Sequence, residues 1–307
     1  MAMYAFSSAS SGAPQLNGLP GSLVAILNYC LVTGMGWTSP YTATNQAAYR
    51  QPAGSNGFYL NVDDSIGQNA RICGFETMSA ILTGANQFPS VGATSAGGGY
   101  FYKSVTADTV SRPWNFWSNG KCFHFYYGSS GTVSGSTLNP GQGIIFTFGD
   151  FPSFKAGDAF NTYIITENGA SQNAAYAPVH YSMSANFQTG HTSYSSVVRP
   201  NTQIGTAIEP SRWVDIPGGS SPNYLGTGNI PYPAPIDGGI NISKVYLGDT
   251  NAGRRGVIPG FWSWQHNSFL NCYDTFNGAG ALAGRTFIVL YQNVGHYIIE
   301  TSDTWSL

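Results

Sequence analysis

The stretch that decides the fold is WNFWSNGKCFHFYY, residues 114–127. It contains two arms in which alternate residues share one face: Trp114, Phe116 and Ser118 in the first, and Phe123, Phe125 and Tyr127 in the second. Asn119-Gly120 joins the arms, and this dipeptide supplies the positive φ angles that a type I′ turn needs. The pattern predicts an antiparallel β-hairpin.

Outward from this hairpin, most of the chain has the short apolar or alternating runs that are typical of strands. Further strands are expected at 58–62, 70–75, 144–148, 161–167, 179–183, 197–198, 240–247, 286–291 and 296–300. The last two form a hairpin across Asn293-Val294-Gly295. The sequence therefore predicts a mainly β fold of antiparallel, sandwich- or barrel-like sheets with long loops.

One amphipathic helix is expected near the N-terminus. The apolar residues that recur there at helical spacing are Leu23, Ile26, Leu27, Cys30 and Leu31. Ser22 precedes them as an N-cap, and Gly34 and Gly36 follow them as terminators. The helix is predicted to be about three turns long, with one side facing the core.

The chain divides into an extended N-terminal arm, 1–20, and a β-rich structural domain, 21–307. The segment 169–230 is polar, rich in glycine and weakly patterned. Because loops of this length are usually functional or packed against a partner, the domain is either one unit or two subdomains split near this segment. Residues 149–158 are expected to form a connecting loop.

The surface is expected to carry few charges, since only 8% of the 307 residues are charged, against roughly 25% in typical domains. Such a surface has little long-range repulsion and loses little side-chain entropy on packing. It favours either permanent assembly or a secreted β protein with a neutral polar surface. The net charge of −2 and the absence of a basic run argue against a basic surface that would bind the phosphate backbone of a nucleic acid.

No membrane insertion is expected, because the apolar stretch 23–32 is too short to span a bilayer. The same stretch lies too far from the N-terminus, with the wrong flanks, for a signal peptide. We therefore expect synthesis in a cytoplasm, with exit only inside a particle. This weakens the secreted alternative.

The sequence contains no recognisable motif of catalytic, cofactor-binding or metal-binding residues. The four cysteines have no CxxC spacing, and Cys30 and Cys73 are interpreted as small core hydrophobes. A histidine such as His124, inside a strand pattern, is more often satisfied by a hydrogen bond than bound to metal. Asp63-Asp64 is interpreted as a turn after a strand, because consecutive strand residues point to opposite faces.

Two aromatic clusters are the remaining candidates for a binding site. Their central members are Trp114 and Trp117 in the hairpin, and Phe261, Trp262 and Trp264 near the C-terminus. Such side chains serve as core, as anchors of a subunit interface, or as platforms that stack on sugar rings. The three interpretations stay open at this point.

Several stretches, taken in their order along the chain, resemble stretches of known proteins. They include LPGSLV (19–24), NQAAYRQ (45–51), FYLNVDD (58–64), SRPW (111–114), GDAFN (157–161), PYP (231–233), RGVIPG (255–260) and IETSDTW (299–305). This order resembles a group of virion structural proteins from tailed bacteriophages of Gram-negative bacteria, from about residue 17 to 305. The resemblance implies a virion component without enzymatic residues.

We therefore expect a non-enzymatic virion protein that is assembled in the host cytoplasm and acts by packing between subunits. Its partners are other virion proteins and further copies of itself, in a ring of cyclic symmetry. The tail, at the baseplate or tail tip, is the first expectation for its place, and a collar, neck or capsid-decoration role is the alternative. A module that binds host-surface glycan is the other alternative.

Overall fold

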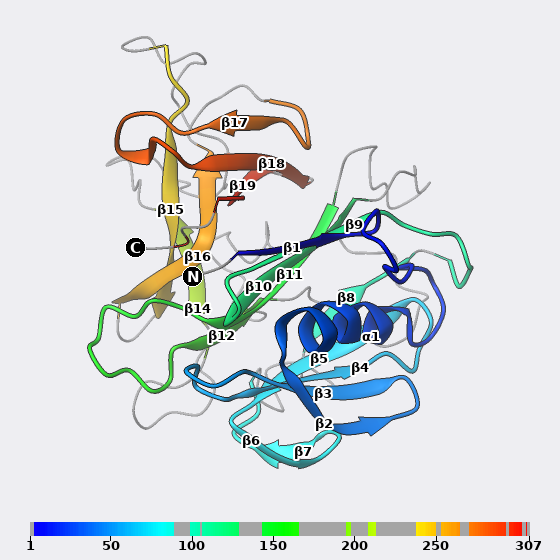
Figure 1. Ribbon diagram of the computed structural model, residues 1–307. Coiled ribbons are helices and arrows are strands. Elements are labelled where there is room, and N and C mark those ends of the chain that lie inside the picture. The colour runs from blue at the N-terminus through cyan, green and yellow to red at the C-terminus, as the bar shows by residue number, and fades with distance from the viewer. Residues whose placement is uncertain are drawn as a thin grey trace, which may run out of the picture.

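The computed structural model describes residues 3–88, 99–104, 106–128, 143–165, 195–197, 208–212, 238–249, 253–264, 270–292, 295–302 and 305 (Figure 1). These residues form four antiparallel sheets and a single short α-helix near the N-terminus. The expected mainly β fold is therefore confirmed. The strand expected at 179–183 lies outside the described residues, as does most of the segment 169–230.

The middle layer is a six-stranded sheet, here called the central sheet, with the order β1-β9-β10-β11-β12-β13. Its strands are β1 (Tyr4–Ser7), β9 (Trp114–Ser118), β10 (Cys122–Gly128), β11 (Gly143–Asp150), β12 (Thr162–Ile165) and β13 (Ser195–Val197). The expected hairpin is β9 and β10, with Phe116 opposite Phe125. Because β11 extends to Asp150, the connecting loop begins two residues later than expected.

The turn between β9 and β10 corrects the type I′ prediction. Gly120 has a φ of 89°, whereas Asn119 is not among the residues with positive φ. The Asn119 side-chain oxygen instead accepts the backbone N–H groups of Lys121 at 3.0 Å and Cys122 at 2.8 Å. Because this side-chain oxygen accepts the two backbone N–H groups of the turn, the turn forms without a second residue in the left-handed conformation.

Two sheets flank the central one. The N-terminal sheet, in the order β2-β3-β4-β5-β8, consists of β2 (Thr38–Ala43), β3 (Gln46–Arg50), β4 (Tyr59–Asp63), β5 (Asn69–Phe75) and β8 (Gly99–Tyr102). A small hairpin of β6 (Thr77–Ala80) and β7 (Thr83–Ala85) packs beside it through Met78, which clusters with Cys73 and Phe75.

The C-terminal sheet has the order β14-β15-β16-β19-β18-β17. Its strands are β14 (Ile208–Arg212), β15 (Ile242–Asp249), β16 (Gly253–Trp264), β17 (Thr275–Asn277), β18 (Thr286–Gln292) and β19 (Gly295–Glu300), with a short 3₁₀ turn η2 (Gly280–Leu282) after β17. The hairpin expected at the C-terminus is β18 and β19, and it is confirmed.

The central sheet is buried on both faces because its alternate side chains enter two different interfaces. On the N-terminal side, Phe101 of β8 lies 5.3 Å from the Phe125 ring and 6.0 Å from the Phe146 ring. On the opposite side, His124 lies 5.5 Å from the Phe261 ring and 4.9 Å from the Trp305 ring. The three sheets therefore stack as layers, visible from bottom to top in Figure 1.

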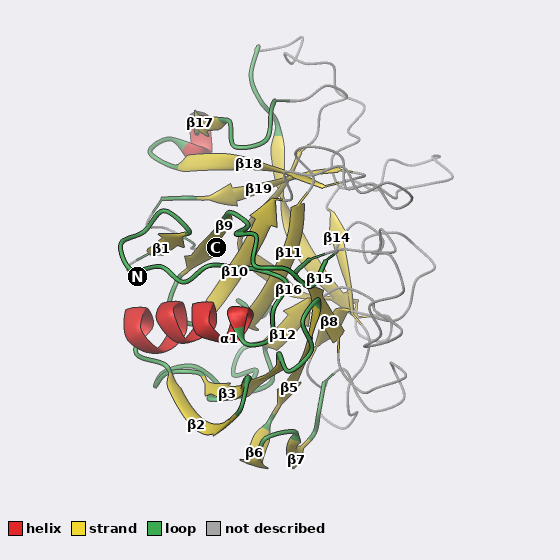
Figure 2. Ribbon diagram, turned by 90° about the vertical axis from the view of Figure 1, so that its right-hand side faces the viewer, coloured by secondary structure: helices red, strands yellow, loops and turns green. Residues whose placement is uncertain are grey.

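The predicted helix forms α1 (Ser22–Leu27) and continues as a π-helical turn, η1 (Asn28–Gly34). Figure 2 shows it between β1 of the central sheet and β3 of the N-terminal sheet, where its apolar face is buried. The element ends at Gly34, as expected. Ser22 is not the N-cap, however, because Gly21 occupies that position with a φ of 83° and the Ser22 hydroxyl donates to the Asn17 carbonyl at 2.9 Å.

The described part of the N-terminal arm packs against its own chain. Tyr4–Ser7 forms β1 and pairs with β9 of its own chain. Phe6 packs against Tyr29 of η1 and Phe116 of β9, and Leu16 is fully buried. The segment is extended, but its apolar side chains anchor it to the core of the same molecule.

Candidate functional site

The five aromatic residues proposed from the sequence are all buried. They are Trp114, Trp117, Phe261, Trp262 and Trp264. Sugar stacking needs an exposed ring face, so the glycan-platform interpretation is corrected for these residues. They belong to the core: Trp114, Trp117 and Phe261 lie in the main cluster that includes the central sheet, and Trp262 and Trp264 pack with Phe287 and Ile298 of the C-terminal sheet.

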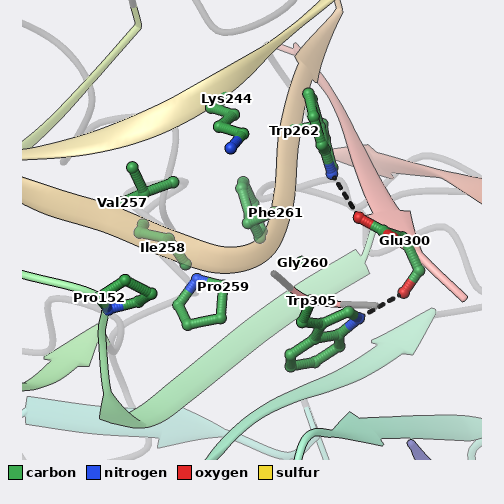
Figure 3. Close-up of a pocket in the computed structure, with 10 residues that line it drawn as sticks. All are labelled: Pro152, Lys244, Val257, Ile258, Pro259, Gly260, Phe261, Trp262, Glu300 and Trp305. Atoms are coloured by element: carbon green, nitrogen blue, oxygen red, sulfur yellow. Dashed lines mark hydrogen bonds between the residues drawn. The ribbon is translucent and has the colours of Figure 1, made fainter. Parts of the chain in front are cut away.

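Trp262 lines a small cavity with Lys244, Glu300 and Trp305 (Figure 3). The cavity holds about 10 Å³, which is the space of one water molecule. Trp262 donates its indole N–H to Glu300 Oε2 at 3.3 Å, and Trp305 donates its indole N–H to the Glu300 backbone carbonyl at 2.8 Å. The cavity is therefore a small packing defect in the core, and it is too small to hold a sugar.

Glu300 is the charged centre of this region and is almost fully buried. Arg285 pairs with it at 3.2 Å, and the Ser302 hydroxyl donates to it at 2.9 Å. The Lys244 ammonium lies 5.9 Å from the Trp262 ring. Burial and the nearby Arg285 lower the pKa of Lys244, while Glu300 opposes this. The cluster thus neutralises one buried carboxylate at the edge of a core.

A chain of four polar side chains from β10, β11 and β12 lies in the central sheet and reaches the C-terminal sheet through His124. His124 Nε2 lies 2.7 Å from the Pro259 carbonyl, which only accepts, so Nε2 carries the proton. Nδ1 then accepts from the Thr147 hydroxyl at 2.9 Å, and Thr147 accepts from Tyr163 at 2.7 Å. The Tyr163 oxygen is left to accept from the Cys122 thiol at 3.1 Å.

Burial holds the titratable members of this chain in their uncharged forms. It lowers the pKa of His124 to about 4, although the bond to Pro259 opposes the shift. It also raises the pKa of Cys122 to about 12 and that of Tyr163 well above its usual value. The expectation of a strand histidine satisfied by hydrogen bonds is confirmed. The chain joins two sheets and keeps Cys122 as a thiol at neutral pH.

A second polar cluster surrounds the N-terminus of α1. Asp64 follows β4, and its Oδ2 accepts the backbone N–H of Leu23 at 2.8 Å and that of Val24 at 3.4 Å. Lys103, which follows β8, forms an ion pair with the same carboxylate, and both side chains are fully buried. Asp63 bonds Ser65 instead, so the two adjacent carboxylates do not converge, as expected.

The loop after β11 presents an exposed aromatic side chain, Phe154, which is 55% exposed. Its ring lies 6.1 Å from that of Tyr246 in β15. Its backbone N–H donates to the Arg255 carbonyl at 2.8 Å, which ties the loop to β16. Sequence reasoning missed this residue, although an aromatic flanked by Ser153 and Lys155 in a turn-rich loop was a usable signal.

An internal ion pair holds this loop rigid. Asp158 Oδ2 accepts from Arg255 Nη2 at 2.8 Å and from the Ser153 hydroxyl at 2.7 Å. Asp158 Oδ1 accepts the backbone N–H of Phe160 at 3.0 Å. Because the loop is ordered before any contact is made, Phe154 would lose little entropy on binding a partner. We take this side chain as the candidate contact site.

Neither a metal site nor a membrane-spanning helix occurs among the described residues. No group of three His, Cys, Asp or Glu side chains in that part of the chain could hold a metal ion. None of the helices found there is both long and apolar enough to cross a bilayer.

The fold and these clusters define the class of protein as a layered, antiparallel β protein with buried polar networks between its sheets. In comparisons with known proteins, no family model matches the chain, and no curated protein matches it either.

Proposed function

We propose that the protein is a structural component of a tailed-bacteriophage virion and acts by packing between subunits. Its first proposed place is the tail, at the baseplate or tail tip. The observation that carries the proposal is a surface with very little charge. Only 8% of the residues are charged, and three of the ion pairs lie within the fold.

These internal pairs leave even less charge on the surface than the composition suggests. Lys103 and Asp64 are fully buried, and the side chains of Arg255 and Asp158 are 8% and 4% exposed. Charges neutralised inside the fold add little to long-range repulsion between copies. Permanent packing of many copies side by side then meets a small electrostatic barrier.

Phe154 supplies the proposed subunit contact. Aromatic residues dominate the binding energy of interfaces when they enter a pocket on the partner. Phe154 is exposed on a loop that Asp158 and Arg255 pre-organise. Further copies of this chain, in a ring, are the proposed partners, together with other virion proteins.

The resemblance to virion structural proteins of tailed phages supports the same proposal. Trp262 and Trp264 are buried, which counts against a glycan-binding site built on these two side chains. Collar, neck and capsid-decoration positions remain alternatives for the location.

The location is tested by mass spectrometry of whole particles and of purified headless tails from the phage that encodes the chain. Detection in both preparations supports the tail. Detection in heads alone indicates decoration, and absence from every particle overturns the virion proposal.

The proposed contact is tested by light scattering of the purified protein at several concentrations. We expect an oligomer in the unaltered chain and a smaller mass for Phe154→Ala. Val110→Ala is the matched control, because Val110 is apolar and 62% exposed on another loop. A monomeric wild-type chain at every concentration, or an unchanged mass for Phe154→Ala, would contradict a self-contact through this residue.

A further inference from the structure

Lys103 and Asp64 are an unusual pair, because neither side chain has any exposed surface. Charged residues are almost never fully buried unless they are paired. The Lys103 Nζ atom is in direct contact with Asp64 Oδ1, and no other donor reaches this oxygen. The amine is therefore placed directly against the carboxyl group.

The other carboxyl oxygen is held by backbone donors. Oδ2 accepts the N–H of Leu23 at 2.8 Å and that of Val24 at 3.4 Å. Two N–H groups aimed at one carboxyl oxygen polarise the carbonyl, and they stabilise negative charge that develops on it during attack at the carbon. These donors belong to the backbone of α1 and are fixed before any reaction.

The amine has two other acceptors. Nζ donates to the Leu19 carbonyl at 2.7 Å and to the Ser22 hydroxyl oxygen at 3.3 Å. The Ser22 hydroxyl gives its own proton to the Asn17 carbonyl, so its oxygen is free to accept from Nζ. An uncharged amine has two N–H groups, which these two acceptors use. Its lone pair is then left on the side of Asp64.

The surroundings also shift the ionisation of both groups towards their uncharged forms. Burial raises the pKa of Asp64 to about 6, against the opposing effects of Lys103 and the two backbone bonds. Burial lowers the pKa of Lys103, against the opposing effect of Asp64. Transfer of one proton from the ammonium to the carboxylate gives an amine and a carboxylic acid and removes the cost of a desolvated ion pair.

From this arrangement we propose that the side chains of Lys103 and Asp64 join in an intramolecular amide bond. Nζ forms a bond to the carboxyl carbon of Asp64, and the negative charge develops on Oδ2, where the N–H groups of Leu23 and Val24 stabilise it. The bond from the carbon to Oδ1 then breaks. Oδ1 leaves as water with the acid proton and one amine proton, so no oxidant or cofactor is needed.

The product leaves its new polar groups satisfied. The amide oxygen, which is Oδ2, keeps the Leu23 and Val24 donors, and the remaining N–H of Nζ keeps the Leu19 carbonyl. Holding the two groups in contact converts a bimolecular condensation into an intramolecular one, which greatly raises its effective concentration. The bond would tie the end of β4 to the segment after β8, beside the start of α1.

The test is the mass of the full-length recombinant chain under denaturing, reducing conditions. We expect a mass lower than that of the sequence by one water molecule. Trypsin should then leave the peptide from Gln51 to Arg71 joined to the peptide that begins at Ile72, with no cleavage after Lys103. A full mass with ordinary cleavage after Lys103 overturns the proposal, and this result needs no variant.

Two variants separate the bond from water loss elsewhere in the chain. Lys103→Arg keeps the positive charge but cannot form the amide, so its mass should equal that of its sequence. Asp64→Asn should form the same product with loss of ammonia instead of water. A missing water in Lys103→Arg would overturn the proposal. If that variant does not fold, the branched peptide of the wild-type chain decides alone.

Discussion

Replacing Trp305 with alanine should weaken the contact between the central and C-terminal sheets. The Trp305 ring is buried, lies 4.9 Å from the His124 ring, and donates its N–H to the Glu300 carbonyl at 2.8 Å. A large aromatic side chain buries about 150–250 Å², which at about 25 cal/mol per Å² gives an upper limit of about 4–6 kcal/mol. Since Trp→Ala changes in cores typically cost about 3–5 kcal/mol, we expect a loss in that range.

The assay is urea unfolding followed by far-ultraviolet circular dichroism, with the midpoint and slope fitted together. With a slope of about 3 kcal/mol per M, the expected loss lowers the midpoint by about 1–1.7 M. Trp305→Phe is the matched control, because it keeps an aromatic ring but leaves the Glu300 carbonyl without its donor. We expect it to cost about 1–3 kcal/mol. A Trp305→Ala loss below about 1 kcal/mol would refute the claim that this ring holds the sheets together.

Three further predictions concern single sites. The pKa of His124 falls from 6.5 to about 4 on folding, so stability should decrease as the pH drops from about 6.5 towards 4. Between pH 7 and pH 5 this costs about 2 kcal/mol, and His124→Gln should remove that part of the pH dependence in urea unfolding. Gly260→Ala should lower the melting temperature more than Gly157→Ala. Both glycines have positive φ, but only at Gly260 would a new Cβ meet the Trp305 ring. Iodoacetamide should label Cys272 before the buried Cys122 in the folded protein, as read by peptide mass spectrometry; equal rates would contradict the burial of Cys122.

Local patterns in the sequence were sufficient for the elements whose signal lies within a few residues. The β9–β10 hairpin follows from alternation on both sides of Asn119-Gly120, and the helix follows from apolar spacing between Leu23 and Leu31. The details of their ends were not predictable to the same degree. Asn119 does not adopt a left-handed conformation, because its own side chain accepts the N–H groups of the turn. At the helix start, Gly21 is the N-cap residue, and the N–H group of Leu23 donates to Asp64, which is remote in sequence.

The role of each aromatic residue depended on tertiary structure. Alternation tells which side chains share a face of a strand, but it does not tell what covers that face. Trp117 is buried in the main core between the stacked sheets, and Trp262 is buried in a separate cluster with Phe287 and Ile298. Phe154, by contrast, is exposed on a loop that is held beside β16. The nearly unbroken apolar run of β10 was consistent with burial on both faces, which only the stacked layers established.

The sequence by itself determined the fold class, the helix, the main hairpins and the scarcity of charge, because these depend on composition and on neighbours within one element. Tertiary structure alone decided which charges are internal and which polar groups meet. Asp64 reaches Leu23 across 41 positions, and His124 reaches Pro259 across 135. Such contacts arise when separate sheets pack, and no pattern of short range encodes them.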